Sequence, residues 1–130
     1  MNRAIGFDQY TIDGNGGFDT ATLVGSNGDD RLQADETIAR LETEEVDFSI
    51  TDFENQSFDG RGGFDVVALD GFDEDDLLEG EGINLRSAID GTSLSVTNFS
   101  FLNAATDLVS RYDMSTVDYL FMLDGDWEEV

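Results

Sequence analysis

The 130-residue chain contains no cysteine, no proline, no histidine and no lysine. Without cysteine it forms neither disulfides nor thiolate metal sites. Because histidine, lysine and cysteine supply most acid–base catalysts and nucleophiles, we expect no enzymatic activity. No stretch reaches the ~20 apolar residues of a membrane-spanning helix, and no signal peptide is visible. The sequence therefore predicts a protein that does not insert into membranes.

Positive charge is also scarce. Thirty Asp and Glu residues oppose six arginines, which gives a formal net charge of -24. A chain this acidic repels phosphates, so we expect it to bind neither nucleic acid nor anionic membrane surfaces. It must also fold against its own repulsion, which bound cations would relieve. Solubility alone is the other explanation for the charge.

The sequence is repetitive. Residues 13–58 and 59–104 are one 46-residue unit written twice, so that Asp13-Gly14-Asn15-Gly16-Gly17-Phe18-Asp19 becomes Asp59-Gly60-Arg61-Gly62-Gly63-Phe64-Asp65. A shorter period of eleven residues relates Gly6-Phe7-Asp8 to Gly17-Phe18-Asp19. A fixed period predicts a stacked repeat fold, and about ten residues suit one strand and one turn on one side of a β-solenoid coil.

Apolar residues within each unit mostly alternate with small or polar ones, as in Val46-Phe48-Ile50 and Leu94-Val96. This period of two predicts short strands with one buried face, separated by turns of Gly, Asp and Asn. We therefore predict an all-β fold, a short right-handed parallel β-solenoid similar to a β-roll. Its repeats would occupy residues 1–104, as a partial coil over 1–12 and units over 13–58 and 59–104.

Residues 105–130 are predicted to cap the open end of this solenoid, because an exposed strand stack promotes aggregation. Ala104 to Tyr112 has apolar residues at helical spacing, so the cap is a candidate helix. Thr37 to Glu45 is either helical or a polar loop. The apolar run from Val117 to Leu123 is a capping strand or a docking element. From this tail we select Trp127, Phe121 and Tyr119 as candidate interface residues.

Four loops share a glycine followed five residues later by aspartate, ending at Asp19, Asp30, Asp65 and Asp76. Calcium needs six to eight oxygen ligands, more than one loop can supply. Loops stacked in register can supply them, each through one carboxylate and several carbonyls, and glycine allows the backbone to curl those carbonyls inward. The alternative is that these aspartates only cap turns by accepting hydrogen bonds from backbone amides.

One loop has a specific resemblance. Gly25 to Gln33 resembles the nonapeptide Gly-Gly-x-Gly-x-Asp-x-U-x of repeats-in-toxin (haemolysin-type) calcium-binding proteins, except that Ser26 replaces the second glycine. The resemblance implies a parallel β-roll that holds Ca²⁺ between coils, with Asp30 at the ligand position. The candidate metal residues are then Asp19, Asp30, Asp65 and Asp76, with Asn27, Asp29, Asp75, Gly25 and Gly28 from the same loops.

The chain also contains Gly-Gly-x-Asp-x-Ala-x-Leu at residues 16–23, followed by Gly-Ser-x-Gly-Asp-Asp-x-Leu at residues 25–32. With these patterns it resembles, over about residues 6 to 104, long repeat proteins of aquatic and marine bacteria that are mostly regarded as secreted β-helical surface proteins. This implies an extracellular or cell-surface location in a bacterium. We therefore predict a calcium-stabilised structural or adhesive module. Its partners would be further copies, as in a filament or surface array, or the remainder of a larger repeat protein.

Two other functions remain open. The recurring Phe7, Phe18 and Phe64 suggest an aromatic ladder in or beside the core, or a platform for sugars. The recurring Arg40 and Arg86 suggest surface ion pairs, with Glu42 or Asp90 as partners, or ligands for an acidic sugar. A carbohydrate-binding domain is thus one alternative. An acidic inhibitor that mimics nucleic acid is the other.

Overall fold

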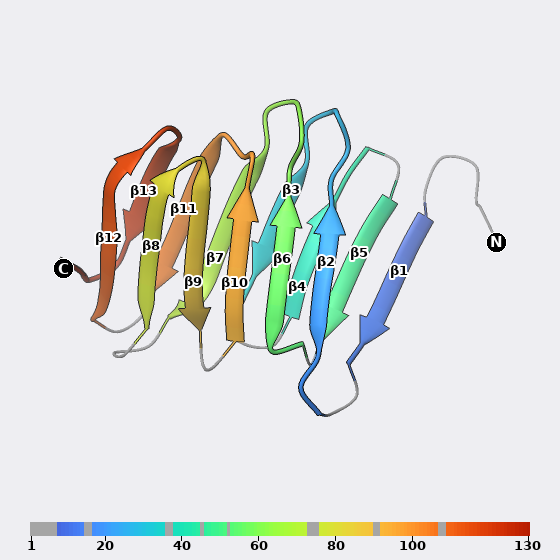
Figure 1. The fold of residues 1–130 in the computed structure, drawn as a ribbon, viewed down its shortest axis with the longest axis horizontal. Helices are drawn as coiled ribbons and strands as arrows, with labels where there is room; N and C mark the ends of the chain where they lie inside the picture. The colour runs from blue at the N-terminus through green and yellow to red at the C-terminus, as the bar shows by residue number, and fades with distance from the viewer. Residues whose placement is uncertain are drawn as a thin grey trace.

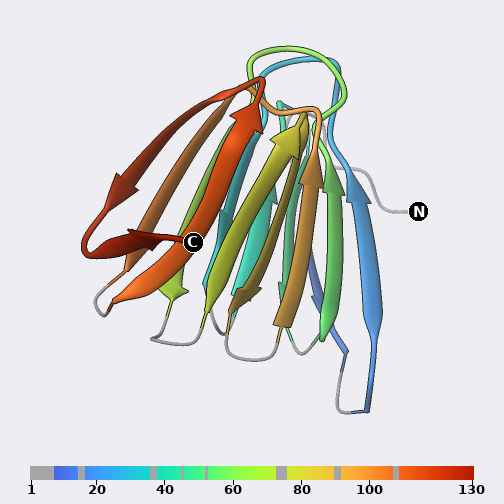
Figure 2. The same cartoon turned by 60° about the vertical axis from the view of Figure 1, so that its left-hand side comes forward.

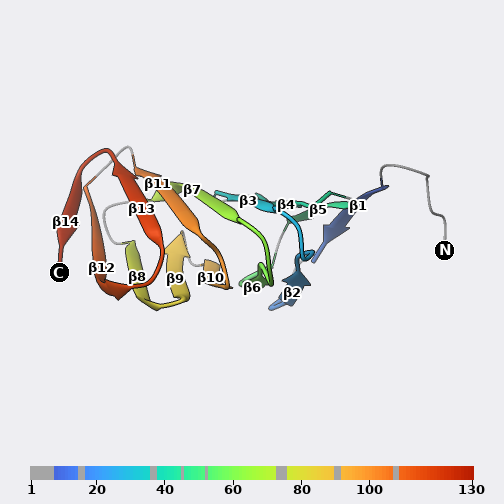
Figure 3. The ribbon, with the colours of Figure 1, turned by 90° about the horizontal axis from the view of Figure 1, so that it is seen from above.

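In the computed structural model, the described residues are 8–14, 17–35, 38–44, 46–51, 53–72, 76–89, 92–106 and 109–130. All helical or strand structure in these ranges is β-strand, which confirms the all-β prediction. The strands form two seven-stranded sheets that lie as two layers and do not close into a barrel (Figures 1 and 3). The same ranges contain no helix of the length and hydrophobicity that a membrane span requires.

Sheet A has the strand order β1-β5-β4-β3-β7-β11-β13. Its strands in chain order are β1 (Asp8–Asp13), β3 (Arg31–Ala34), β4 (Ile38–Glu42), β5 (Val46–Thr51), β7 (Val66–Phe72), β11 (Phe101–Thr106) and β13 (Leu120–Asp124). Sheet B has the order β14-β12-β8-β9-β10-β6-β2. Its strands are β2 (Thr20–Val24), β6 (Asn55–Asp59), β8 (Leu77–Gly82), β9 (Asn84–Ile89), β10 (Thr92–Thr97), β12 (Ser110–Val117) and β14 (Trp127–Glu129).

Strand direction is nearly uniform within each sheet. Among the strands of sheet A only β4 runs against the others. Among those of sheet B only β9 does so. Both sheets are therefore mixed, and the expectation of parallel strands is met everywhere except at these two. A hairpin needs only a short turn, which explains how the chain can add a reversed strand without leaving the sheet.

The two reversed strands belong to matching insertions. β3, β4 and β5 form an antiparallel meander in sheet A, and β8, β9 and β10 form one in sheet B. The first meander has strands beginning at residues 31, 38 and 46, and the second at residues 77, 84 and 92. Each strand of one meander is thus 46 residues from its counterpart in the other, on the opposite sheet.

Three pairs of hydrogen-bonded neighbouring strands follow a different interval. Arg31 in β3 pairs with Val66 in β7, which pairs with Phe101 in β11, so these three strands are 35 residues apart. Thr20 in β2 pairs with Asn55 in β6 at the same interval. The two intervals, 46 and 35, differ by the eleven residues of the short sequence period. Eleven residues form one strand and one turn, which carries the chain from one sheet to the other.

The core lies between the two sheets and is made by alternate residues of each strand. Leu32, Val67 and Leu102 are in register on β3, β7 and β11, and all three are buried. Other fully buried apolar residues are Ile50, Leu69, Phe72, Leu78, Leu85 and Ala104. This inward alternation is the period-two pattern read from the sequence, because successive strand residues point to opposite faces.

Both helix candidates are wrong over the described residues. Residues 38–42 form β4, in which Ala39 and Leu41 are buried while Ile38 is exposed. Residues 101–106 and 110–117 form β11 and β12, which pair in parallel with β7 and β8. Neighbouring strands offer these segments a ladder of backbone hydrogen bonds and a buried face, which outweighs local helix propensity. The expected boundary at residue 104 falls inside β11.

One buried polar group in this core has no partner. Ser87 on β9 points inward opposite Leu78 and Leu94, and its Oγ is buried without a hydrogen bond. We expect Ser87→Ala to raise the unfolding free energy by about 1 kcal/mol, because an unpaired buried hydroxyl is destabilising. Urea unfolding measures this, with exposed Ser95→Ala as the control within about 0.5 kcal/mol of wild type. A loss of stability in Ser87→Ala would contradict the expectation.

Candidate metal site at the loop edge

Two of the four glycine–aspartate loops lie side by side. The loop over residues 25–30 joins β2 to β3, and the loop over 60–65 joins β6 to β7. Because β2 pairs with β6 and β3 pairs with β7, the loops meet at one edge of the molecule (Figure 2). The Asp30 amide donates to Asp65 Oδ1 at 2.8 Å, and the Phe64 amide donates to Asp29 Oδ1 at 2.7 Å.

In the first loop the aspartate caps its own turn. The Ser26 amide donates to Asp30 Oδ2 and the Ser26 hydroxyl donates to Asp30 Oδ1, both at 2.6 Å. A Cβ at Gly25 would collide with Asp30 Oδ2, so only glycine fits beneath the carboxylate. Ser26, the departure from the nonapeptide, therefore holds both carboxylate oxygens of Asp30. This is the turn-capping role, the alternative to calcium binding for these aspartates.

The second loop leaves its aspartate incompletely bonded. Asp65 is only 3% exposed, yet its Oδ2 has no hydrogen-bond partner within the described part of the chain. The Arg61 amide is the equivalent of the Ser26 amide in the first loop. It donates instead to Asp59 Oδ1 at 2.9 Å. Asn98 Nδ2 donates to the same Asp59 oxygen, also at 2.9 Å. These two bonds hold the pKa of Asp59 below its usual value, whereas Asp65 receives no such bond at Oδ2.

The electrostatics of Asp65 follow from this arrangement. Burial raises the pKa of Asp65 to about 6, and the nearby charges of Asp30, Asp29 and Asp59 add to the increase. The hydrogen bond from the Asp30 amide lowers the pKa of Asp65, but burial has the larger effect. A carboxylate in this position is stabilised either by a proton or by a bound cation.

A further oxygen lies near the unpaired atom. A Cβ at Gly60 would collide with both Asp65 Oδ2 and the Asn98 carbonyl oxygen, so these two oxygens converge above the glycine. A void of about 20 Å³ borders Asp30, Asp65 and Gly60, with mostly apolar walls on its other sides. Because its walls are almost entirely apolar, this void does not itself hold a cation, which would have to lie on the side of the two oxygens. The donors are all oxygens, as calcium prefers.

The other two aspartates lie at the opposite edge. Asp19 precedes β2 and Asp76 precedes β8, two strands with the same direction that are separated in sheet B by β6, β10 and β9. Asp19 is linked to Glu54, whose Oε2 accepts from the Asp19 amide at 2.7 Å. Asp76 is buried, and its carbonyl oxygen accepts from the Arg111 amide at 3.3 Å. The structure thus brings Asp30 and Asp65 together but neither with Asp19 or Asp76.

Most of the remaining candidate ligands belong to the first loop. Asn27 and Asp29 are exposed. A Cβ at Gly28 would come within 2.7 Å of Glu44 Oε1, which places a further carboxylate above this loop. Asp75 lies outside the described residues. Among those that are described, no three Asp or Glu side chains converge as a ready-made metal site, so a cation here would depend on backbone oxygens and water.

Sequence reasoning missed Asn98, the Asp59 carboxylate and Glu44, because these residues lie outside the glycine–aspartate spacing. Asn98 did carry a signal. It adopts a left-handed backbone with φ of 57°, a conformation that asparagine tolerates better than most residues. An Asn directly after a strand is a candidate for such a turn. Its proximity to Asp65, 33 positions earlier, depends on tertiary stacking and has no local signal.

The recurring aromatic residues do not form a ladder. Phe18 and Phe64 are 77% and 55% exposed, and they precede Asp19 and Asp65 at opposite edges of the molecule. This corrects the expectation of a stacked aromatic column in or beside the core. Because 46 residues carry the chain to the other sheet, repeat-equivalent positions cannot stack on each other. Phe7 lies outside the described residues.

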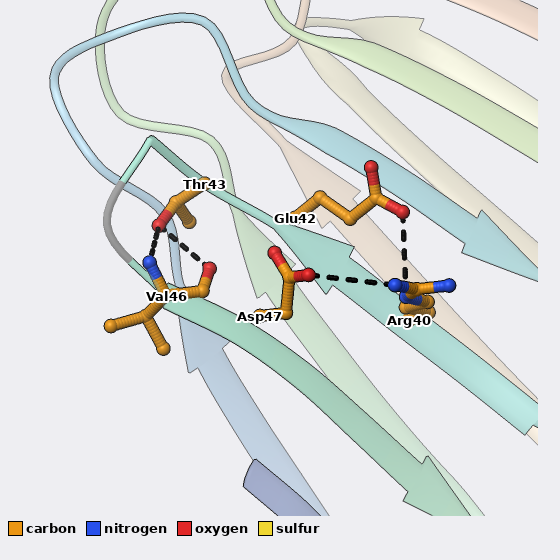
Figure 4. Close-up of polar contacts among 5 residues, drawn as sticks. All are labelled: Arg40, Glu42, Thr43, Val46 and Asp47. Carbon is orange, nitrogen blue, oxygen red and sulfur yellow. Dashed lines mark hydrogen bonds and ion pairs between the residues drawn. The ribbon is translucent and has the colours of Figure 1, made fainter. Parts of the chain in front are cut away.

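The two recurring arginines differ in their surroundings. Arg40 Nε lies 3.3 Å from Glu42 Oε1, and Arg40 Nη2 lies 3.4 Å from Asp47 Oδ2, which is the surface ion pairing predicted (Figure 4). Arg86 lines an open depression of about 560 Å³ on sheet B, together with Glu79 and Asp113. The described lining contains no aromatic side chain on which a sugar ring could stack.

The candidate interface residues occupy three different settings. Trp127 packs edge-on against Phe72, with ring centroids 5.0 Å apart, and donates from Nε1 to the Asp124 carbonyl at 2.9 Å. Tyr119 is buried within the chain, where its hydroxyl donates to the Asn84 carbonyl at 3.0 Å. Phe121 is 40% exposed on β13. Trp127 therefore closes the core at the C-terminal end, while Phe121 offers surface.

Comparison with known proteins identifies no relative: no protein-family description, no curated protein and no solved structure matches this chain.

Proposed function

We propose that this chain is a non-catalytic structural module, a short parallel β-solenoid of two 46-residue units that is stabilised by calcium and belongs to an extracellular or surface protein of a bacterium. Two features support the solenoid. The chain passes alternately between the two sheets, and neighbouring strands in three pairings are 35 residues apart. The reversed strands β4 and β9 are then hairpins inserted into otherwise parallel coils.

The observation that carries the calcium proposal is Asp65 Oδ2, a buried carboxylate oxygen with no hydrogen-bond partner. The Asn98 carbonyl converges with it above Gly60, and Asp30 lies in the adjacent loop. Calcium would supply the positive charge that this group lacks, and hard oxygen donors suit it. In a chain with a net charge of -24, an ion at this edge also reduces repulsion between the stacked loops.

Thermal unfolding at neutral pH, with calcium and then with chelator, tests this proposal. Binding to the folded form alone adds about 2.7 kcal/mol when free calcium is 100 times the dissociation constant. We expect this gain in wild type and its loss in Asp65→Asn. Asp113→Asn removes the same charge from the exposed face of sheet B and should keep the response. Equal melting temperatures of wild type in calcium and in chelator would refute calcium stabilisation.

A further inference from the structure

Each sheet ends in a strand that has a free edge among the described residues. β1 and β2 are the terminal strands of sheets A and B at one end, and β13 and β14 are the terminal strands at the other (Figures 1 and 3). Only β4 and β9 are reversed, so β1 runs parallel to β13 in sheet A, and β2 runs parallel to β14 in sheet B. The two ends of the molecule are therefore matched in strand direction.

The β13 edge lacks the usual protection against strand pairing. Leu120, Phe121 and Met122 are three consecutive apolar residues with exposures of 69%, 40% and 57%. Soluble proteins generally protect such edges with lysine, proline or inward-pointing charges. This chain contains no lysine and no proline. A bare apolar edge of this kind marks an interaction surface.

The opposite end exposes apolar residues of its own. Ile12 on β1 and Val24 on β2 are 41% and 48% exposed. Ile12 pairs in register with Ile50, which is completely buried, so Ile12 stands on the inward face of sheet A with its outer side uncovered. Leu23 on β2 is only partly buried against the core. Core-facing side chains are thus incompletely covered at both ends, Ile12 and Leu23 at this end and Phe121 and Leu123 at the other.

We propose that copies of this chain stack end to end, the β13 and β14 edges of one copy continuing into the β1 and β2 edges of the next. Strand direction and the inward-facing positions allow a parallel register that places Leu123 beside Ile12 and Asp124 beside Asp13. Such a contact joins two different surfaces and does not close on itself, so it produces a linear filament. The inference rests on the proposed structural function and names its partner as a second copy.

Charge controls this association. Each copy carries -24, and the register places the carboxylates of Asp124 and Asp13 at the junction. Repulsion extends over a Debye length of roughly 30 Å at 10 mM salt but only about 4–5 Å at 0.5 M salt. We therefore expect a weight-average mass close to that of one chain at low salt, and a mass that rises with protein concentration at high salt. Sedimentation equilibrium measures both.

Two double variants with blocked ends test the head-to-tail arrangement. Ile12→Asp with Val24→Asp blocks one end, and Leu120→Asp with Met122→Asp blocks the other. Each variant alone should remain monomeric at high salt. An equimolar mixture should form a one-to-one dimer that does not grow, because each partner keeps one intact end. Ile38→Asp with Ile83→Asp adds the same charge at exposed sites away from the ends and should associate like wild type.

The outcomes separate this inference from the calcium proposal. A wild-type chain that stays monomeric at high salt and high concentration refutes stacking, whatever calcium does to its melting temperature. Dimerisation of either blocked variant alone refutes the head-to-tail arrangement, because it requires a symmetric contact. Association of wild type without any calcium effect on melting supports stacking and refutes only the metal. Far-ultraviolet circular dichroism confirms that the variants fold, and the wild-type measurement is decisive without them.

Discussion

Replacing Gly63 by alanine is expected to lower the unfolding free energy by more than about 3 kcal/mol, whereas the same change at its repeat equivalent Gly17 should lower it by about 1–2 kcal/mol. Both glycines have φ of 86°, so both substitutions force an L-residue into the left-handed region. They differ in what a Cβ would meet. At Gly63 it would collide with the Gly28 carbonyl oxygen, whereas at Gly17 nothing lies within 4 Å.

The pair of glycine variants therefore separates backbone strain from the packing of one loop on the next. Urea or thermal unfolding of both measures the difference, and Gly63→Ala should lower Tm by roughly 10 °C or more. The collision is with backbone, which cannot turn aside as the end of a flexible side chain can. Equal losses at the two positions would show that the loop over residues 60–65 does not rest on the loop over 25–30.

The second large effect is a loss of stability on raising the pH, measured in chelator. The folded pKa of Asp65 is raised from 3.8 to about 6. Between these values the folded state holds a proton that the unfolded state has released, so stability falls as pH rises through this window. The stabilising contribution is present below about pH 4 and is gone above about pH 6. Its size is at most about 3 kcal/mol.

Asp65→Asn isolates this contribution. Asparagine keeps an oxygen for the Asp30 amide and cannot ionise, so the variant should be more stable than wild type above pH 6 when calcium is absent. Urea unfolding at pH 4, 5, 6 and 7 should show an advantage that grows and then levels off. Exposed Asp113→Asn should show a much smaller trend. An advantage of Asp65→Asn that does not change with pH would contradict the assigned titration.

Calcium should reverse the order of these two proteins. At pH 7 the ionised Asp65 is the form that binds a cation, so saturating calcium favours wild type over Asp65→Asn. Without calcium the unpaired carboxylate favours the variant. The same atom, Asp65 Oδ2, produces both effects because it is buried and has no partner among the described residues.

Much of the local structure follows from short-range patterns. The alternation of Val46, Phe48 and Ile50 predicts a strand with one inward face, and in β5 Ile50 lies in the core with Phe48 packed against it. The Asp124-Gly125 turn is also predictable, since Gly125 adopts φ of 96° between β13 and β14. The helix candidates were wrong for a physical reason. Spacing alone cannot reveal that β7 and β8 offer parallel partners to residues 101–106 and 110–117.

The candidate site was predictable only in part. The spacing from Gly25 to Asp30 and from Gly60 to Asp65 indicates loops whose carboxylates turn back on their own glycines, and the structure contains such turns. In the first loop the Ser26 amide donates to Asp30 Oδ2. In the second loop the equivalent Arg61 amide donates to Asp59 and leaves Asp65 Oδ2 without this bond. The sequence does contain a difference that accounts for this change, since Asp59 precedes the second glycine whereas Val24 precedes the first, and an aspartate readily accepts from the amide two residues later.

By itself, the sequence determined a strand-rich chain without disulfides, the two intervals of 46 and 11 residues, and the excess of negative charge. Tertiary structure alone decided which residues meet. In three strand pairs the spacing is 35 residues, because the chain completes two crossings and one inserted hairpin before it returns to the same sheet. Asp30 therefore meets Asp65 across the repeats, while the repeat equivalents Asp19 and Asp65 lie at opposite edges.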